Sequence, residues 1–404
     1  MADLIVRLPA SLIRSFTALL VVAGFTVPLG AQATHRKDPP VSPRWSEAVA
    51  VLDSFVTADA VVGAALVMVR DGQIVEEHYL GWSDQERQVP AVRGTVWHWG
   101  SITKTLTAVA AMQQRERGRL TLESRVTEWL PELRQIHNPY GSMDDLTVRM
   151  LLSHTSGLPG GTWPWTRGEA WEPFEPTRYE QLVAMMPYQR LAFAPGTEYR
   201  YSNPALLYLA RIVELITNDP WQGYVQKNLF APLGITESSF GTTPYHLAPR
   251  RSHGYTVLRN GSGNVVRDNG ADFDPGITIP NGGWNAPVSD LALWAGFLMG
   301  SASPARQTRF DAVLPRSTLE SMWTPVIATG EEDRMGLSFF LRGTGADRVI
   351  GHTGTQGGFR SFLWVRPGSR TAIIGVVNTS NEVAPERSDE GFREVMAAAR
   401  GVLR

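Results

Sequence analysis

The chain has 404 residues, of which 43% are hydrophobic and 9% aromatic, and its net charge is −1. This composition suits a well-packed soluble globule, and the balanced charge without a basic run excludes the electrostatic footprint of a nucleic-acid-binding protein. The chain contains no cysteine, which excludes disulfides, and its eight histidines are scattered. We therefore expect no metal and no other cofactor.

Residues 1–33 have the features of an export signal. Arg7 and Arg14 supply its positive charge, residues 16–29 form an apolar stretch, and residues 31–33 fit a small-x-small cleavage site. The apolar stretch is shorter than the roughly 20 residues that span a bilayer. We predict an exported protein, periplasmic or secreted, without stable membrane insertion after the signal is cleaved; an uncleaved N-terminal anchor is the alternative.

The N-terminal part is predicted to begin with a polar linker over residues 34–43. Its predicted elements are a helix over residues 44–57, strands over 61–70 and 73–79, and a helix from Ser101 to about Gly118. Asp71-Gly72, between the two strands, is typical of a hairpin turn.

The middle of the chain, about residues 120–285, is predicted to form a mainly helical lobe. The predicted elements from there on are helices over residues 146–153 and 204–217, strands over 348–352, 361–365 and 372–378, and a helix over 389–403. Strands at both ends favour an α+β fold, with one antiparallel sheet from the N- and C-terminal segments, flanked by helices and carrying the lobe as an insertion.

The most informative residues are Ser101 and Lys104, which form an S-x-x-K motif where a helical pattern begins. Lys104 is one of three lysines in the chain. Positions i and i+3 share a helix face, so the amine can reach the serine hydroxyl and, when buried, lose its proton and act as a base. On these residues alone, a capping serine followed by a surface lysine is the simpler explanation.

Tyr201 and Asn203 form a second candidate set, just before the helix predicted from Pro204. A tyrosine near an ammonium group can shed its proton and shuttle protons between the serine and a leaving group. Asn203 can donate to a substrate carbonyl and accept a hydrogen bond from Lys104.

A third set, His352-Thr353-Gly354-Thr355, stands at the end of a predicted strand. The glycine lets a substrate backbone lie against the strand edge, and the Thr355 N–H can complete an oxyanion hole with that of Ser101. His352 can donate to a substrate carboxylate. In isolation, a strand-end turn with a satisfied histidine is the simpler explanation of this segment.

The three motifs, in the order S-x-x-K, Y-x-N and H-T-G, resemble those of the serine β-lactamase-related hydrolases of the class C type. That family includes β-lactamases, penicillin-binding-protein-like DD-carboxypeptidases, D-aminopeptidases and esterases. Residues 151–159 (LLSHTSGLP) and 281–284 (NGGW) are also similar to it, and the resemblance spans about residues 45–400. It implies a β-lactamase/transpeptidase-like fold and one catalytic domain over residues 44–404.

The resemblance implies that Ser101 is the acylated nucleophile and that Lys104 and Tyr201 transfer its proton. It assigns substrate binding to Asn203, His352, Thr353, Gly354 and Thr355. His352 departs from the lysine usual in β-lactamases of this type. Because histidine is mostly neutral at pH 7, a β-lactam is the less expected substrate, and a carboxylate substrate would bind better below about pH 6.5.

Several aromatic residues near these motifs need an interpretation. The loop after residue 159 carries a possible aromatic rim for an apolar substrate group, formed by Trp163, Trp165 and Trp171. Packing of these rings against their own loop is the alternative. Trp97 and Trp99 are expected to pack in the core, and His154 is expected to form a hydrogen bond with loop backbone. For Trp284, a position at the border of the cleft and a position away from it are both left open.

The favoured hypothesis is an exported serine hydrolase that cleaves an ester or amide in a small molecule or peptide through an acyl-enzyme. Two alternatives remain open. One is a non-catalytic or slowly turning-over penicillin-binding or peptidoglycan-sensing module that kept the fold, and the other is a structural envelope protein. The sequence does not indicate an oligomeric state.

Overall fold

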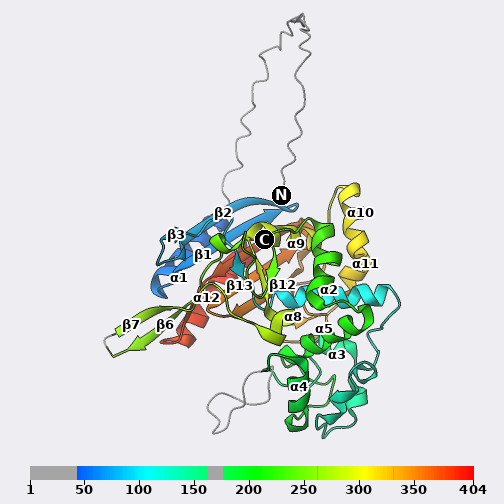
Figure 1. Cartoon of the computed structure of the whole chain (residues 1–404). Coiled ribbons are helices and arrows are strands. Elements are labelled where there is room, and N and C mark those ends of the chain that lie inside the picture. The colour runs from blue at the N-terminus through cyan, green and yellow to red at the C-terminus, as the bar shows by residue number, and fades with distance from the viewer. Residues whose placement is uncertain (1–42, 162–175, 262, 331) are drawn as a thin grey trace, which may run out of the picture. The chain divides into compact units, whose positions relative to one another are not determined.

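The centre of the fold is a sheet in which early and late strands of the chain lie side by side (Figure 1). The computed structural model describes residues 43–161, 176–261, 263–330 and 332–404. Within them the strand order is β3 (Val89–Pro90), β2 (Gln73–Asp84), β1 (Gly63–Arg70), β14 (Thr371–Val377), β13 (Phe359–Arg366), β12 (Val349–Gln356), β11 (Phe340–Arg342), β10 (Asp333–Met335) and β9 (Ile327–Ala328). Neighbouring strands run antiparallel, and β1 pairs with β14 so that Ala64 is opposite Val377. The predicted α+β fold, with one antiparallel sheet from both ends of the chain, is confirmed.

Both faces of this sheet are covered by helices. The helices are α2 (Thr103–Glu116) and α9 (Val288–Met299) on one face, and α1 (Pro43–Ala58) and α12 (Pro385–Val402) on the other. Alternate residues of β1 point to opposite faces. Val67 and Val69 pack in the α2 and α9 core, whereas Leu66 and Met68 pack in the α1 and α12 core. This double burial explains why β1 is a continuous apolar run rather than an alternating one.

The hairpin turn predicted at Asp71-Gly72 joins β1 to β2. Asp71 has φ 49° and Gly72 has φ 74°. Two consecutive positive φ angles are the type I′ geometry that suits the twist of a two-residue hairpin, which is why an Asp-Gly pair marks the turn in the sequence.

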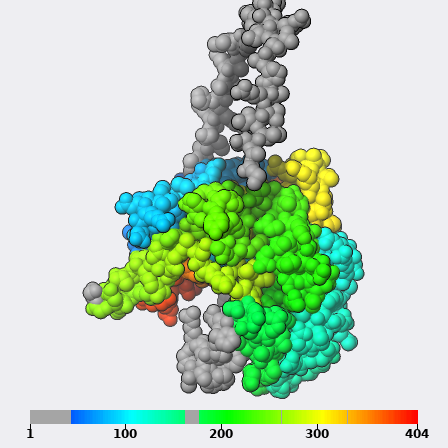
Figure 2. Space-filling model, in the orientation of Figure 1, coloured from blue at the N-terminus to red at the C-terminus, as the bar shows by residue number. Residues whose placement is uncertain are grey.

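The segment predicted as a helical lobe contains helices and also a hairpin that the sequence did not indicate. Its helices include α3 (Val148–Leu152), α4 (Tyr179–Met185), α5 (Asn203–Thr217), α6 (Trp221–Val225), α7 (Ala231–Leu233) and α8 (Ile279–Gly282). The hairpin of β6 (Tyr255–Asn260) and β7 (Gly263–Asp268) protrudes from the surface (Figure 2) and pairs through β6 with β15 (Thr379–Asn381). β7 is exposed along its length, so its sequence lacks the alternation of apolar and polar residues that would predict a strand.

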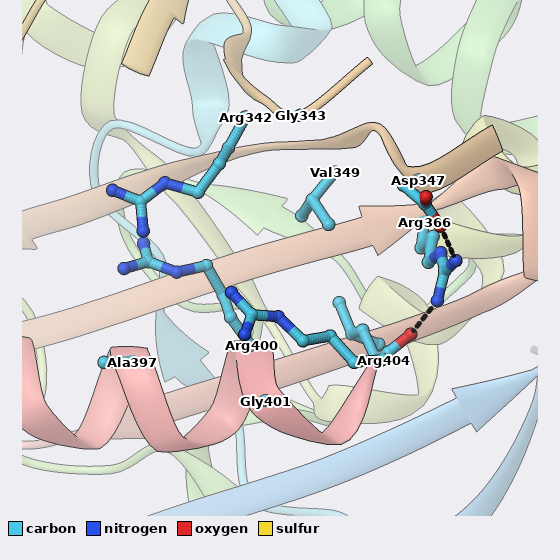
Figure 3. Close-up of a pocket in the computed structure, with 10 residues that line it drawn as sticks. Arg342, Gly343, Asp347, Val349, Arg366, Ala397, Arg400, Gly401 and Arg404 are labelled. Atoms are coloured by element: carbon cyan, nitrogen blue, oxygen red, sulfur yellow. Dashed lines mark hydrogen bonds and ion pairs between the residues drawn. The ribbon is translucent and has the colours of Figure 1, made fainter. Parts of the chain in front are cut away.

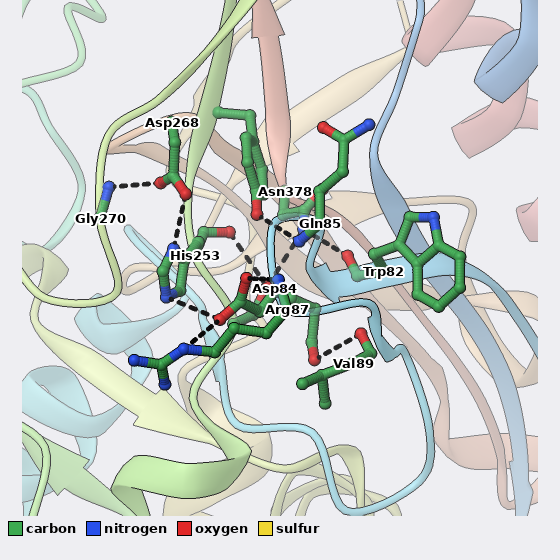
Figure 4. A network of polar contacts seen from close by, with 12 residues as sticks. Trp82, Asp84, Gln85, Arg87, Val89, His253, Asp268, Gly270 and Asn378 are labelled. Atoms are coloured by element: carbon green, nitrogen blue, oxygen red, sulfur yellow. Dashed lines mark hydrogen bonds and ion pairs between the residues drawn. The ribbon is translucent and has the colours of Figure 1, made fainter.

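A polar network fixes the base of this hairpin to the end of β2 (Figure 4). His253 Nδ1 lies 2.8 Å from Asp268 Oδ2, and its Nε2 lies 3.5 Å from Asp84 Oδ2. The backbone N–H of Gln85 donates to the Tyr255 hydroxyl at 2.9 Å. The protruding arm is therefore anchored at its root.

Further elements in the described ranges are a small sheet and two more helices. They include the small sheet of β4 (Trp97–His98), β8 (Trp284–Ala286) and β5 (Ser239–Phe240), and the helices α10 (Pro304–Val313) and α11 (Arg316–Ser321). β8 pairs with β4, which places residues 281–286 beside the segment that leads into α2.

The N-terminal predictions fall mostly on residues that the structure does not describe. The expected signal at residues 1–33 lies outside the described residues, as does the expected linker except for Pro43, which is the first residue of α1. By their contacts, residues 41–404 form one unit. Within the described ranges, no helix has the length and apolar character needed to cross a bilayer.

Candidate active site

Ser101 lies in the turn that leads into α2. Backbone bonds from Thr103 N to Gly100 O and from Lys104 N to Ser101 O, both 3.0 Å, wind this turn. The regular helix begins at Thr103, two residues later than the sequence pattern predicted. Ser101 and Lys104 still share one face, because the turn brings i and i+3 side chains together.

Lys104 is fully buried, which excludes the surface lysine that the motif alone allowed. Its Nζ donates to Ser101 Oγ at 2.9 Å and to the backbone oxygen of Asn281 at 2.7 Å. Burial lowers the pKa of Lys104 well below its usual value. No carboxylate in the described part of the chain pairs with Lys104, and such a buried amine is a good proton acceptor for the adjacent hydroxyl.

Tyr201 lies across the site from Lys104, whose Nζ is 4.9 Å from the centre of the tyrosine ring. The Tyr201 hydroxyl is buried and makes no well-aligned hydrogen bond to a described residue. Burial raises the pKa of Tyr201 far above its usual value, and the nearby Ser101 hydroxyl offsets this only in part. Burial therefore favours the neutral phenol in the resting protein, and the proton-shuttle role expected for Tyr201 stays a prediction.

Asn203 is the first residue of α5, and Ser202 caps that helix by accepting from Ala205 N at 3.4 Å. The expected hydrogen bond between Lys104 and Asn203 is absent from the described part of the chain. The carbonyl oxygen of Asn281 accepts from Lys104 instead. Sequence reasoning missed this contact, although residues 281–284 were singled out as a family-like stretch.

His352 is buried in β12, with 1% of its surface exposed. Its Nδ1 lies 2.6 Å from the Thr353 carbonyl oxygen. A carbonyl only accepts, so Nδ1 carries the proton and Nε2 presents a lone pair. Burial, reinforced by the charge of Lys104, lowers the pKa of His352 to about 3. Burial therefore disfavours the expected imidazolium, and the role of His352 toward a substrate carboxylate stays a prediction.

Gly354 and Thr355 lie directly against the segment that precedes the nucleophile. A Cβ on Gly354 would lie 2.0 Å from Trp99 O, and one on Gly100 would lie 2.9 Å from Thr355 N. Ser361 Oγ on β13 donates to Trp99 O at 3.0 Å and holds the two segments together. The edge of β12 is thus placed beside Ser101, as the proposed oxyanion hole requires.

His154 packs against the ring of Tyr201. The Ser202 backbone N–H donates to His154 Nδ1 at 3.1 Å, which confirms the expected bond to loop backbone. The imidazole stacks on the Tyr201 ring with centroids 4.5 Å apart. Burial lowers the pKa of His154 well below its usual value, with Lys104 contributing. A neutral imidazole therefore fixes the plane of the phenol.

Buried polar atoms without a protein partner gather around Lys104 and Tyr201. Among the described residues these atoms include Tyr201 OH, His154 Nε2, His352 Nε2 and Asn281 Oδ1. An unpaired buried polar atom costs on the order of 1–3 kcal/mol. Such a concentration is typical of a place where a substrate supplies the missing partners.

The aromatic residues divide clearly. Trp97 and Trp99 are fully buried, as expected, and Trp99 Nε1 donates to Ala286 O at 2.8 Å. Trp284 is also fully buried, with Nε1 bonded to Ser238 Oγ at 3.0 Å, so it does not border a cleft. The residues Trp163, Trp165 and Trp171 lie outside the described residues. Within the described ranges, no group of His, Asp and Glu is arranged to hold a metal ion.

Comparison with known proteins agrees with this geometry. The family model described as Beta-lactamase matches residues 48–397. The chain belongs to this family. Its sheet, flanking helices and inserted lobe have the β-lactamase/transpeptidase-like fold. Family membership assigns the chain in general terms to the serine hydrolases.

Individual relatives differ in their named activities. Protein flp of Staphylococcus aureus (strain COL) is 24% identical over 324 residues, 80% of this chain and 61% of that protein. Esterase EstB of Burkholderia gladioli is 32% identical over 259 residues, 58% of this chain and 64% of EstB. The chain thus spans less than two thirds of these curated relatives. The structure of D-amino acid amidase from Ochrobactrum anthropi SV3 complexed with D-phenylalanine covers 89% of this chain and 100% of its own, with TM-score 0.68 and 21% identity, and shows the fold.

Proposed function

We propose that this protein is a serine hydrolase that cleaves an uncharged ester, or an amide without a free carboxylate, through an acyl-enzyme on Ser101. The observation that carries the proposal is the bond from the buried Lys104 Nζ to Ser101 Oγ at 2.9 Å. It pairs a nucleophile with a base whose pKa is lowered by burial, which is what an activated serine requires.

In this mechanism the neutral amine of Lys104 takes the proton of Ser101 as Oγ attacks the substrate carbonyl. The developing oxyanion is stabilised by the N–H groups of Ser101 and Thr355. Tyr201, which burial keeps protonated, donates its phenolic proton to the leaving oxygen or nitrogen and recovers one from the Lys104 ammonium. Water then attacks the acyl-enzyme by the reverse sequence, releasing the acid.

The preference for an uncharged substrate follows from His352. A charged group at this place would attract a substrate carboxylate, but the neutral ring offers only a lone pair at Nε2. That lone pair suits a substrate N–H or O–H donor instead. The 32% identity to the esterase EstB supports ester cleavage, and the amidase neighbour makes a D-amino-acid amide the next candidate.

We also propose that the protein is exported to the periplasm or secreted. This rests on the charged, apolar and small-x-small order of residues 1–33. Detection of a mature N-terminus following Ala33 in material secreted or released from the periplasm tests it. Retention of the full-length chain in the membrane fraction would instead support the uncleaved anchor.

Intact-mass spectrometry over time tests the catalytic proposal. The protein is mixed in parallel with a short-chain nitrophenyl ester, a D-Ala-D-Ala peptide and a β-lactam. We expect fast acylation and fast clearance with the ester, and little adduct with the two carboxylate-bearing reagents. Ser101→Ala should abolish every adduct and the hydrolysis of the ester.

The matched control is Ser303→Ala, which makes the same chemical change at an exposed serine before α10. It should retain wild-type turnover. Full ester hydrolysis by Ser101→Ala would show that another group is the nucleophile. An adduct on Ser101 that persists with every reagent would favour the slowly turning-over penicillin-binding module, and the absence of both an adduct and ester hydrolysis would favour a non-catalytic one.

A further inference from the structure

A cavity lies away from Ser101, between the C-terminal end of α12 and the sheet. Its volume is about 630 Å³, within the usual range of small-molecule sites. Its polar lining consists of Arg342, Asp347, Arg366, Arg400 and Arg404. Its apolar lining includes Val349 of β12 and Leu403. The lining is therefore mainly basic, with an apolar part.

The arginines of this cavity fall into two groups (Figure 3). Arg366 is committed to the fold, because it forms an ion pair with Asp347 and donates to Leu403 O at 2.7 Å, capping the last turn of α12. The guanidinium groups of Arg342, Arg400 and Arg404 gather on the other side. We name this second group the arginine wall.

The acids near the arginine wall form ion pairs with Arg342 rather than with the other two arginines. Arg342 is paired with Asp333 at 2.7 Å and with Glu332 at 3.2 Å. Arg400 packs over the Trp364 ring at 5.1 Å, and within the described residues neither Arg400 nor Arg404 has a carboxylate partner. Burial first, and then the charge of Arg342, lowers the pKa of Arg400, and the carboxylates of Asp333 and Glu332 offset this only in part. Like charges held together in this way repel one another unless an anion binds.

We propose that the arginine wall binds the phosphate group of a small phosphorylated molecule, whose apolar part lies against Val349 and Leu403. A phosphate carries close to two negative charges at neutral pH and offers several acceptor oxygens, which matches converging guanidinium forks better than a singly charged carboxylate. The site is separate from the proposed hydrolytic site and does not depend on its chemistry.

Calorimetric titration of the whole protein with inorganic phosphate and with diphosphate tests the proposal, with sodium chloride at matched ionic strength as the reference. We expect diphosphate to bind and to raise the thermal midpoint, whereas chloride does neither. Arg400→Gln and Arg404→Gln should each weaken binding by about tenfold or more, the range expected for a hydrogen bond to a charged group. Because Arg404 is exposed and has no carboxylate partner in the described ranges, its replacement should leave folding intact.

The matched control is Arg119→Gln, which removes one positive charge from an exposed arginine on the loop after α2. It should bind diphosphate like the wild type. Equal weakening by Arg119→Gln would show a general charge effect and overturn the proposal, as would equal midpoint shifts with chloride and diphosphate.

The phosphate can be free or part of a lipid headgroup, and vesicle sedimentation separates these sources. Binding to phosphatidylglycerol vesicles, but not to phosphatidylcholine vesicles, with loss in Arg404→Gln would assign the wall to a lipid phosphate. Binding of soluble diphosphate alone would assign it to a free ligand. Binding of neither probe would refute the site.

Discussion

The contact between Gly354 and Trp99 makes the most direct prediction about catalysis. A Cβ at Gly354 would lie 2.0 Å from Trp99 O and 2.6 Å from Ser361 Oγ, whereas ordinary contacts begin at 3.4 Å. Gly354→Ala must therefore move the edge of β12 away from the nucleophile turn by more than about 1 Å. A displacement of this size at a catalytic group costs on the order of 10²-fold in rate.

The assay is kcat for a short-chain nitrophenyl ester, together with unfolding in urea. We expect Gly354→Ala to lose about 10²-fold in kcat and roughly 1–3 kcal/mol in the free energy of unfolding, as overpacked sites do. Gly351→Ala makes a similar clash in the same strand, 1.9 Å from Leu363 O, but does not face Trp99. It should lose stability with a much smaller change in kcat.

Gly223→Ala is the second control, because nothing lies within 4 Å of a Cβ there and the residue is in helix α6. It should be neutral or slightly stabilising. If Gly354→Ala folds and keeps kcat within about twofold of wild type, the oxyanion hole does not depend on this contact, and the argument from displacement of a catalytic group fails for this site.

Further expectations follow from the buried titratable groups. Lys104→Met should lower turnover by about 10²–10⁴-fold without lowering the free energy of unfolding at pH 7, because it replaces a buried amine of lowered pKa; a clear loss of stability would contradict this. KM for a carboxylate substrate should not change from pH 5.5 to 8, since the pKa of His352 is about 3. A KM that rises with pH, with a midpoint near 6.5, would instead indicate that a charged His352 binds the carboxylate. Stability should fall as pH drops from 7 to 5, because the unfolded chain takes up protons on His98 and His352 that the native chain, with pKa values of about 4 and 3, does not. The effect is about 2 kcal/mol per histidine at pH 5, and an unchanged pH slope in His352→Asn would argue against it.

Much of the fold was accessible from the sequence because its central elements carry strong local signals. β1 is a continuous apolar run, Asp71-Gly72 encodes a type I′ turn, and α5 begins one residue before the predicted Pro204. The strands β9 to β11 are two or three residues long, too short for a period to be read. They are defined by pairing at the edge of the sheet rather than by their own residues.

The sequence indicates which residues come together at the candidate site, but it does not indicate their hydrogen bonds or protonation states. The S-x-x-K spacing alone brings Ser101 and Lys104 together. The acceptor of the second Lys104 bond lies on Asn281, 177 positions away, and only the folded chain reveals it. The tautomer of His352 depends on the orientation of one carbonyl, and the neutrality of Tyr201 depends on burial. These properties depend on tertiary packing and cannot be predicted from the residue types alone.

The pairing of β1 with β14 also determines when the central sheet can form during synthesis of the chain. Because Ala64 pairs with Val377, nearly the whole polypeptide must emerge from the ribosome before the apolar strand β1 gains its second neighbour. At ordinary synthesis rates this interval is on the order of tens of seconds. During it the free edge of β1 can pair with other nascent chains. Prematurely terminated products keep that edge open, so they depend on chaperones or are degraded, whereas the completed chain closes it in one late, long-range step.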